Sequence, residues 1–152
     1  MDDAASDTAA RRRWMAILAR ARPAEIERLL APLPPLPGYT RLRGPESGLV
    51  MLRGRAGGTG TAFNCGEMTV TRCTVRDRGG RIGHAYIPGR DLRHAELAAA
   101  LDAAMQEPER APALEAAVIA PLAADQHDAR EAKARRAAAT RVEFFTMATM
   151  RT

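Results

Sequence analysis

The chain has 152 residues, of which 46% are hydrophobic and 27% charged, and its formal net charge is +5. The length suits one structural unit, and the composition is too apolar for a disordered chain and too poor in cysteine for a disulfide scaffold. No apolar run approaches the ~20 residues of a membrane span, and the acidic start at residues 1–3 does not resemble a signal peptide. We therefore expect a cytoplasmic protein in which Cys65 and Cys73 stay free thiols.

The charge is uneven along the chain, and nearly all of the positive charge comes from arginine. Lys133 is the only lysine among 23 basic residues. Residues 38–95 carry a net charge of +6, whereas residues 96–121 carry −4. Arginine supplies planar, bidentate donors to phosphate and carboxylate groups, so the middle of the chain favours an anionic ligand or an acidic partner surface. Coding bias explains the same preference for arginine without any such ligand.

Two short helices and a linker are predicted at the start of the chain. Residues 9–21 place three large apolar side chains at helical spacing. Residues 23–30 begin with a proline, which a helix tolerates at its first position. The prolines of residues 32–38 exclude a helix interior or a central strand there. We expect residues 1–37 to form N-terminal helices followed by a linker.

Four strand patterns follow, with glycine-rich turns between neighbours. They cover residues 39–43, 49–55, 67–77 and 81–87. The connections at residues 44–48 and 78–80 are too short for a helical crossover, so the sheet is expected to be antiparallel. Asp91 is then the expected N-cap of a helix that runs to about residue 106. Residues 38–107 are thus predicted to form a four-stranded antiparallel sheet plus a helix.

The last part of the chain, residues 108–152, is predicted to be a helical extension. Pro108 and Pro112 bracket a break, a short helix follows to Ile119, and an Ala- and Arg-rich stretch continues from residue 122. A helix faced with alanine buries little apolar area, so the extension needs contact with other elements or a partner. The complete prediction is an α+β fold in one structural unit, with N-terminal helices, a four-stranded antiparallel sheet, a helix after the last strand and a long Ala-rich C-terminal helical extension.

Candidate anion-binding residues come from a glycine-rich loop, two strands and a helix start. They are Gly57, Gly58, Thr59, Gly60, Arg72, His84, Arg90 and His94. The backbone amides of such a loop can surround an anion, and a helix N-terminus attracts one. Each feature also has a structural explanation: the loop can be a hairpin connection, and the Asp91 cap can organise the helix start through local hydrogen bonds.

No catalytic or metal-binding residue can be assigned from the motifs. The chain contains no nucleophile-elbow, zinc-protease or Walker pattern. Cys65 and Cys73 lie eight residues apart, outside the spacing of zinc or iron–sulfur motifs, and His84 and His94 lack the spacing of a metal pair. We therefore predict no metal site and no cofactor bound by this chain alone.

Several segments together resemble the PhnG family of bacterial phosphonate metabolism. They are Arg55-Ala56-Gly57-Gly58-Thr59-Gly60, the run from Phe63 to Cys73, Gly83-His84-Ala85-Tyr86, Gly89-Arg90-Asp91 with His94-Ala95-Glu96, and the run from Ala138 to Met147. The resemblance implies a subunit of the carbon–phosphorus lyase machinery, with PhnI-, PhnH-, PhnJ- and PhnK- or PhnL-type subunits as partners. It also implies a reaction in which an alkylphosphonate displaces adenine from MgATP and becomes attached to the ribose C1. It carries no catalytic residue over to this chain.

The resemblance favours an assembly role in that complex, with no nucleic-acid and no membrane partner, and two alternatives stay open. The chain could contribute ligand-binding residues to the transferase site, or it could be a basic module that binds nucleic acid, which the pI of 10.2 suggests. The apolar side chains Phe144, Phe145 and Met147 are the candidate partner contacts. A chain whose apolar faces are made for partners is also expected to self-associate in isolation.

Overall fold

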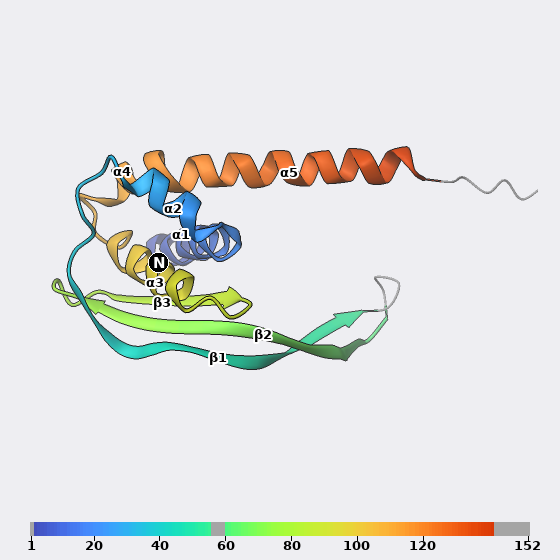
Figure 1. Cartoon of the computed structure of the whole chain (residues 1–152), viewed down its shortest axis with the longest axis horizontal. Coiled ribbons are helices and arrows are strands. Elements are labelled where there is room, and N and C mark those ends of the chain that lie inside the picture. The colour runs from blue at the N-terminus through green and yellow to red at the C-terminus, as the bar shows by residue number, and fades with distance from the viewer. Residues whose placement is uncertain (1, 56–59, 142–152) are drawn as a thin grey trace, which may run out of the picture.

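A three-stranded antiparallel sheet is the base of the molecule. The structure is a computed structural model that describes residues 2–55 and 60–141. The strands lie in the order β1-β2-β3, with β1 at Tyr39–Arg55, β2 at Ala62–Asp77 and β3 at Ile82–Pro88. All of the described helices lie on one side of this sheet, and no described helix covers its other face (Figure 1).

The prediction of four strands was wrong, because the expected turn at residues 44–48 lies inside β1. Pairing with β2 shifts register between Arg41 and Arg43 and again between Arg43 and Glu46. The extra residues bulge out of the ladder without ending the strand. Since β1 is an edge strand, it tolerates Pro45, which has no N–H to donate. The α+β class itself is consistent with the structure.

The sheet is much longer on one side than on the other. The pairing of β3 with β2 extends only from Arg76 to Val70, whereas β1 and β2 continue to pair beyond that point. Residues 49–55 and 62–69 therefore form a two-stranded ribbon, here called the ribbon, which projects past the end of β3 (Figure 1). The strand at residues 49–55 was predicted from the sequence, but the extension of β2 beyond the end of β3 was not.

The helices form a layer over the base of the sheet and one long projection. Their bounds are α1 Asp2–Arg20, α2 Pro23–Leu30, α3 Leu92–Ala104, α4 Ala111–Leu114, the π-helical turn η2 Glu115–Ile119, and α5 Ala120–Ala139. Instead of a separate short helix, α4, η2 and α5 form one continuous rod. Pro121 cannot donate a hydrogen bond to the preceding turn, and the wide π turn lies directly before it. None of the helices among the described residues is long and apolar enough to cross a membrane.

The core between the helices and the sheet depends on small residues in α3. Six alanines of this helix are buried: Ala95, Ala98, Ala99, Ala100, Ala103 and Ala104. They let α3 approach β3 so closely that a Cβ at Gly83 would collide with the backbone of Ala99. Larger apolar side chains from α1, α2 and the rod, such as Leu18, Ile26 and Leu122, close the other side of α3.

A buried carboxylate joins three of these elements. Asp102 of α3 is fully buried and accepts hydrogen bonds from Nη2 of Arg11 at 2.7 Å and from Nε1 of Trp14 at 2.9 Å. It also accepts from the backbone N–H of His84 at 2.8 Å. A buried charge is tolerated when it is paired and hydrogen-bonded in this way. Asp102 thereby fixes α1 and α3 against the free edge of β3.

Candidate functional site

Arg72 and His84 lie together on the outer face of the sheet, away from the helices. Buried Cys73 lies between the half-exposed neighbours Arg72 and Thr74, so side chains along β2 alternate between the two faces. Strand pairing places Tyr86 opposite Arg72 and His84 opposite Thr74, whose hydroxyl lies 3.2 Å from Nδ1 of His84. The structure therefore brings two of the predicted anion-binding residues onto one exposed surface.

Carboxylates already engage the arginines on this outer face. Nε of Arg72 and Nε of Arg43 both reach Oε1 of Glu46, at 2.8 and 3.1 Å. Hydrogen bonds to Tyr86 and Glu46 raise the pKa of Arg72, so its guanidinium stays charged. Two guanidinium groups share one carboxylate, so a small positive excess is left on this exposed surface.

On the helix side of β1, Arg41 is bound by α3. Its Nε and Nη2 donate to the two carboxylate oxygens of Glu96 at 2.7 and 2.9 Å, and the Tyr39 hydroxyl donates to Oε1 at 3.0 Å. The hydrogen bond from Arg41 lowers the pKa of Glu96. The bidentate geometry attaches the edge strand to α3 across the sheet, so Arg41 is occupied by a structural pair.

The structure separates Arg90 from His94, which the sequence grouped in one site. His94 is 5% exposed, and its Nε2 donates to the Leu18 carbonyl at 2.8 Å, so the ring joins α3 to α1. The predicted cap is confirmed, because Oδ1 of Asp91 accepts from the His94 N–H at 2.9 Å. Arg90 is exposed, and no described residue forms an ion pair or a hydrogen bond with its side chain. Of the two, only Arg90 lies where a ligand can reach it.

Arg90 is positioned at the base of the ribbon. The preceding Gly89 has a φ of +93°, a conformation that favours glycine, and its N–H donates to the Thr69 carbonyl at 2.9 Å. Thr69 is paired in turn with Leu49 of β1, where the ribbon begins. A tight turn thus places the backbone of Arg90 next to the start of the ribbon, and its side chain has no partner among the described residues.

Part of the predicted site lies outside the described residues. These residues are Gly57, Gly58 and Thr59 of the loop and Phe144, Phe145 and Met147 of the tail. Of the loop residues, Gly60 is described, and its carbonyl accepts a hydrogen bond from Nη1 of Arg55 at 2.9 Å. Among the described residues, no group of three His, Cys, Asp or Glu side chains could hold a metal ion.

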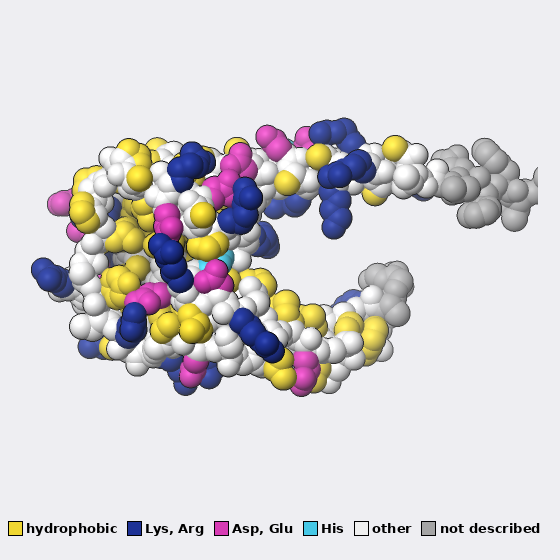
Figure 2. Space-filling model, viewed as in Figure 1, with side chains coloured by type: hydrophobic (Ala, Val, Ile, Leu, Met, Phe, Trp, Pro, Cys, Tyr) yellow, Lys and Arg dark blue, Asp and Glu magenta, His cyan; other side chains and the backbone are white. Residues whose placement is uncertain are grey.

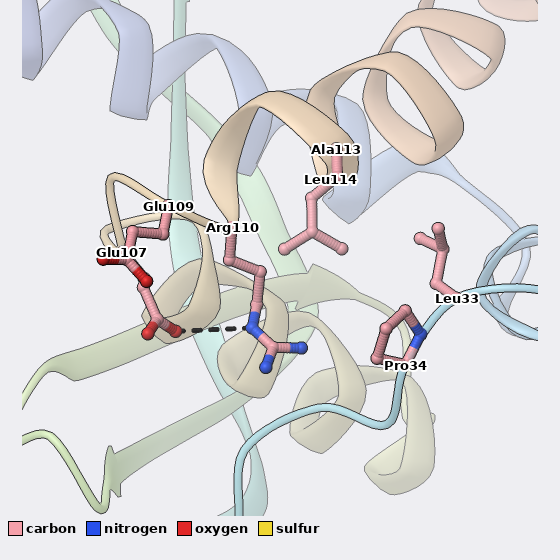
Figure 3. Close-up of a pocket in the computed structure, with 7 residues that line it drawn as sticks. All are labelled: Leu33, Pro34, Glu107, Glu109, Arg110, Ala113 and Leu114. Atoms are coloured by element: carbon pink, nitrogen blue, oxygen red, sulfur yellow. Dashed lines mark hydrogen bonds and ion pairs between the residues drawn. The ribbon is translucent and has the colours of Figure 1, made fainter.

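A pocket of about 280 Å³ lies between the linker after α2 and the start of α4 (Figure 3). Arg110 dominates it, with Nε 3.3 Å from Oε2 of Glu107 and Nη1 donating to the Pro35 carbonyl at 3.0 Å. The wall is completed by Leu33, Pro34, Glu109, Ala113 and Leu114. Its charges attach the linker to α4, and none of the described anion-binding candidates lines it, so we do not assign it to a ligand.

The ribbon exposes large apolar side chains that the sequence analysis did not single out. They are Leu49, Met51, Leu52 and Phe63, which are 42–62% exposed. The sequence signal was the continuous apolar run at residues 49–52, for which no covering helix was predicted on either face. Apolar side chains in such numbers on a two-stranded projection are typical of a protein interface.

The rod ends in a similarly uncovered element. Along the twenty residues of α5, Leu122 is the buried residue, and the side chains after residue 133 are exposed. At 1.5 Å per residue, α5 is about 30 Å long, so most of it extends beyond the core (Figure 1). A helical segment as short as the exposed distal half of α5 is marginal in water without tertiary contacts, so contact with a partner would stabilise it.

Comparison with known proteins identifies the family. The sequence profile described as "Phosphonate metabolism protein PhnG" matches residues 9–150. The chain belongs to the PhnG family. A protein of Rhizobium meliloti (strain 1021), named "Alpha-D-ribose 1-methylphosphonate 5-triphosphate synthase subunit PhnG", is 45% identical over 149 residues, covering 96% of this chain and 92% of the relative. The resemblance described from the sequence motifs is therefore confirmed at the level of the family.

Proposed function

We propose that the chain is an assembly subunit of a ribose 1-methylphosphonate 5-triphosphate synthase in phosphonate metabolism. The observation that carries the proposal is the 45% identity, over nearly its whole length, to a protein named as a subunit of that synthase. The uncovered ribbon and the uncovered half of α5 support it, because both expose surface that a partner subunit would bury. The complex would attach an alkylphosphonate to the ribose C1 of MgATP with release of adenine.

The outer sheet face gives little support to a nucleic-acid module. Its arginines are partly compensated within the chain, since Arg43 and Arg72 share Glu46. Single-stranded nucleic acid binds to proteins through bases that stack on aromatic side chains. Such side chains are sparse on this face, where exposed Tyr86 lies beside the arginines. The partners that we propose are therefore subunits of the PhnI, PhnH, PhnJ and PhnK or PhnL types.

The proposal is tested by leaving the chain out. The synthase subunits are co-expressed with and without it, and adenine release from MgATP and methylphosphonate is measured. We expect adenine release to fall by at least ~tenfold without the chain and to return when the chain is added back. Equal rates in the two preparations would exclude a role in the synthase.

A contribution to ligand binding is a second candidate role, and Arg90 is the residue that favours it. Its side chain is exposed and unpaired among the described residues, unlike Arg93, which pairs with Glu27 at 2.6 Å. If Arg90 contacts a phosphate or phosphonate group, Arg90→Ala should raise KM about tenfold while the complex assembles normally. Arg93→Ala is the matched control and should leave KM unchanged. Unchanged kinetics in Arg90→Ala would remove the chain from the ligand site.

A further inference from the structure

The helix-covered face of the sheet continues, without its cover, along the ribbon. Ser47 and Thr71 are paired and joined by a 3.0 Å hydrogen bond, and Thr71 is fully buried on the helix side. Because strand side chains alternate, Leu49 and Met51 lie on this same face. Next to the core this face is covered by helices, but here Leu49 is 62% and Met51 52% exposed.

The side of α5 that faces the ribbon lies opposite this uncovered sheet face. Leu122 is buried in the core, and Nε2 of Gln126 donates to the Ile17 carbonyl at 2.9 Å, so these residues mark the core side of the helix. Residues three and four apart lie on one helix face, which places Ala129, Lys133 and Arg136 on the continuation of that side. Figure 2 shows an open hollow between α5 and the ribbon, with basic side chains of α5 reaching into it.

The charges of this hollow are unequal. Lys133 and Arg136 lie on the α5 wall, and Arg53 follows Met51 along the ribbon, just beyond the register shift after Leu52. Glu67, paired with Met51, is the acidic residue that this pairing places on the ribbon wall. Leu49 and Met51 therefore make the ribbon wall of the hollow apolar, and the charged side chains around the hollow carry a net positive charge.

We propose that this hollow binds a segment of another synthase subunit that carries acidic and apolar side chains. The inference rests on the proposed function and specifies the surface through which it is exercised. Charge complementarity selects the occupant: a second copy of this chain, with its net charge of +5, would bring positive charge to a positive site. An acidic segment would instead place carboxylates near Lys133 and Arg136 while its apolar side chains cover Leu49 and Met51.

Cross-linking tests this inference directly, because Lys133 is the only lysine of the chain. A carbodiimide joins an amine to a carboxylate that touches it, with no spacer. In the intact complex we expect a cross-link from Lys133 to an aspartate or glutamate of another subunit. The matched control is the double variant Lys133→Arg with Arg135→Lys, which keeps the charge but moves the amine to the opposite face of α5, where Arg135 lies 3.4 Å from Glu131. The cross-link should disappear in this variant.

Competition for assembly provides an independent measurement. Tagged variant and untagged wild-type chains are co-expressed with the other subunits, and their ratio in the purified complex is measured by mass spectrometry. Leu49→Ser and Lys133→Glu should each be under-represented by about tenfold. Their controls are Leu49→Met, which keeps an apolar side chain at the same position, and Arg135→Glu on the opposite helix face; both should compete equally with the wild type. Thermal melting shows whether Leu49→Ser folds. If it does not fold, the comparison of Lys133→Glu with Arg135→Glu tests the proposal on its own.

The outcomes separate the two proposals. If wild-type chain is absent from the purified complex, the proposed function fails. If wild-type chain is present but Leu49→Ser and Lys133→Glu compete as well as their controls, the hollow is not the docking site. Cross-links from Lys133 only to a second copy of this chain would likewise overturn the proposed occupant.

Discussion

At the scale of single residues, Asp102 joins three elements through one carboxylate. Its oxygens accept from Arg11, Trp14 and the His84 backbone, and the side chain has no exposed surface. Asp102→Asn keeps the shape but replaces an acceptor oxygen by a donor group that faces other donors. We expect a loss of about 3–5 kcal/mol in the free energy of unfolding, measured by urea denaturation. Glu46→Gln, in the exposed outer cluster, is the control and should change it far less; equal effects would contradict the structural role of Asp102.

The pair of Arg41 and Glu96 predicts how stability depends on acid. The hydrogen bond from Arg41 lowers the pKa of Glu96 in the folded chain. A lowered pKa means that the unfolded chain binds the proton more readily, so this stabilisation is present above the ordinary glutamate pKa of about 4.3 and is lost as pH falls below it. Arg41→Gln should therefore flatten the decline of stability between about pH 5 and pH 3. The slope is measured by urea titrations at several pH values, and a slope as steep as that of Arg76→Gln would refute this origin.

At the scale of elements, α3 and α5 are both rich in alanine but differ in what covers them. Six alanines of α3 are buried, whereas α5 buries Leu122 and leaves its distal half exposed. In the free chain we expect backbone amides of residues 130–139 to exchange with deuterium much faster than those of residues 98–103, because helices without tertiary contacts open readily. Within the synthase complex the distal amides should become protected. Equal exchange in free and assembled chain would show that no partner covers α5.

Most elements could be predicted from the sequence, because helix caps, prolines and apolar spacing act locally. The Asp91 cap and the helix start at Pro23 are such cases. The single strand β1 could not, since residues 44–48 contain the glycines and proline of a turn, and only pairing with β2 holds them in a bulged strand. The break expected between Pro108 and Pro112 is present, since α3 ends at Ala104 and α4 begins at Ala111. The joining of α4, η2 and α5 into one rod was missed because Pro121 suggested that a short helix ends at Ile119, whereas the chain continues there through a π turn.

The candidate site shows the same limit more sharply. Arg72 and His84 could be placed together because their strands are neighbours, whereas His94 turned out to be buried against Leu18 of α1, a contact between distant segments. The exposure of Leu49 and Met51 depends on where β3 stops, which strand patterning does not reveal. Contacts between distant segments therefore bury His94 at the helix start and leave Leu49 and Met51 exposed in the hollow.

At the scale of the whole molecule, the core is compact at one end and two uncovered projections extend from it (Figures 1 and 2). The ribbon and α5 expose apolar and basic side chains, and no other described element covers them. Such a shape suits a subunit whose exposed apolar side chains become buried against its partners, as in obligate complexes.

Native mass spectrometry of the co-expressed synthase subunits tests the assembly role most directly. We expect this chain to be recovered in a fixed stoichiometric ratio within the synthase complex, and complexes formed without it to be smaller or incomplete. A complex of unchanged composition that never contains the chain, with the chain recovered separately, would contradict the assembly role.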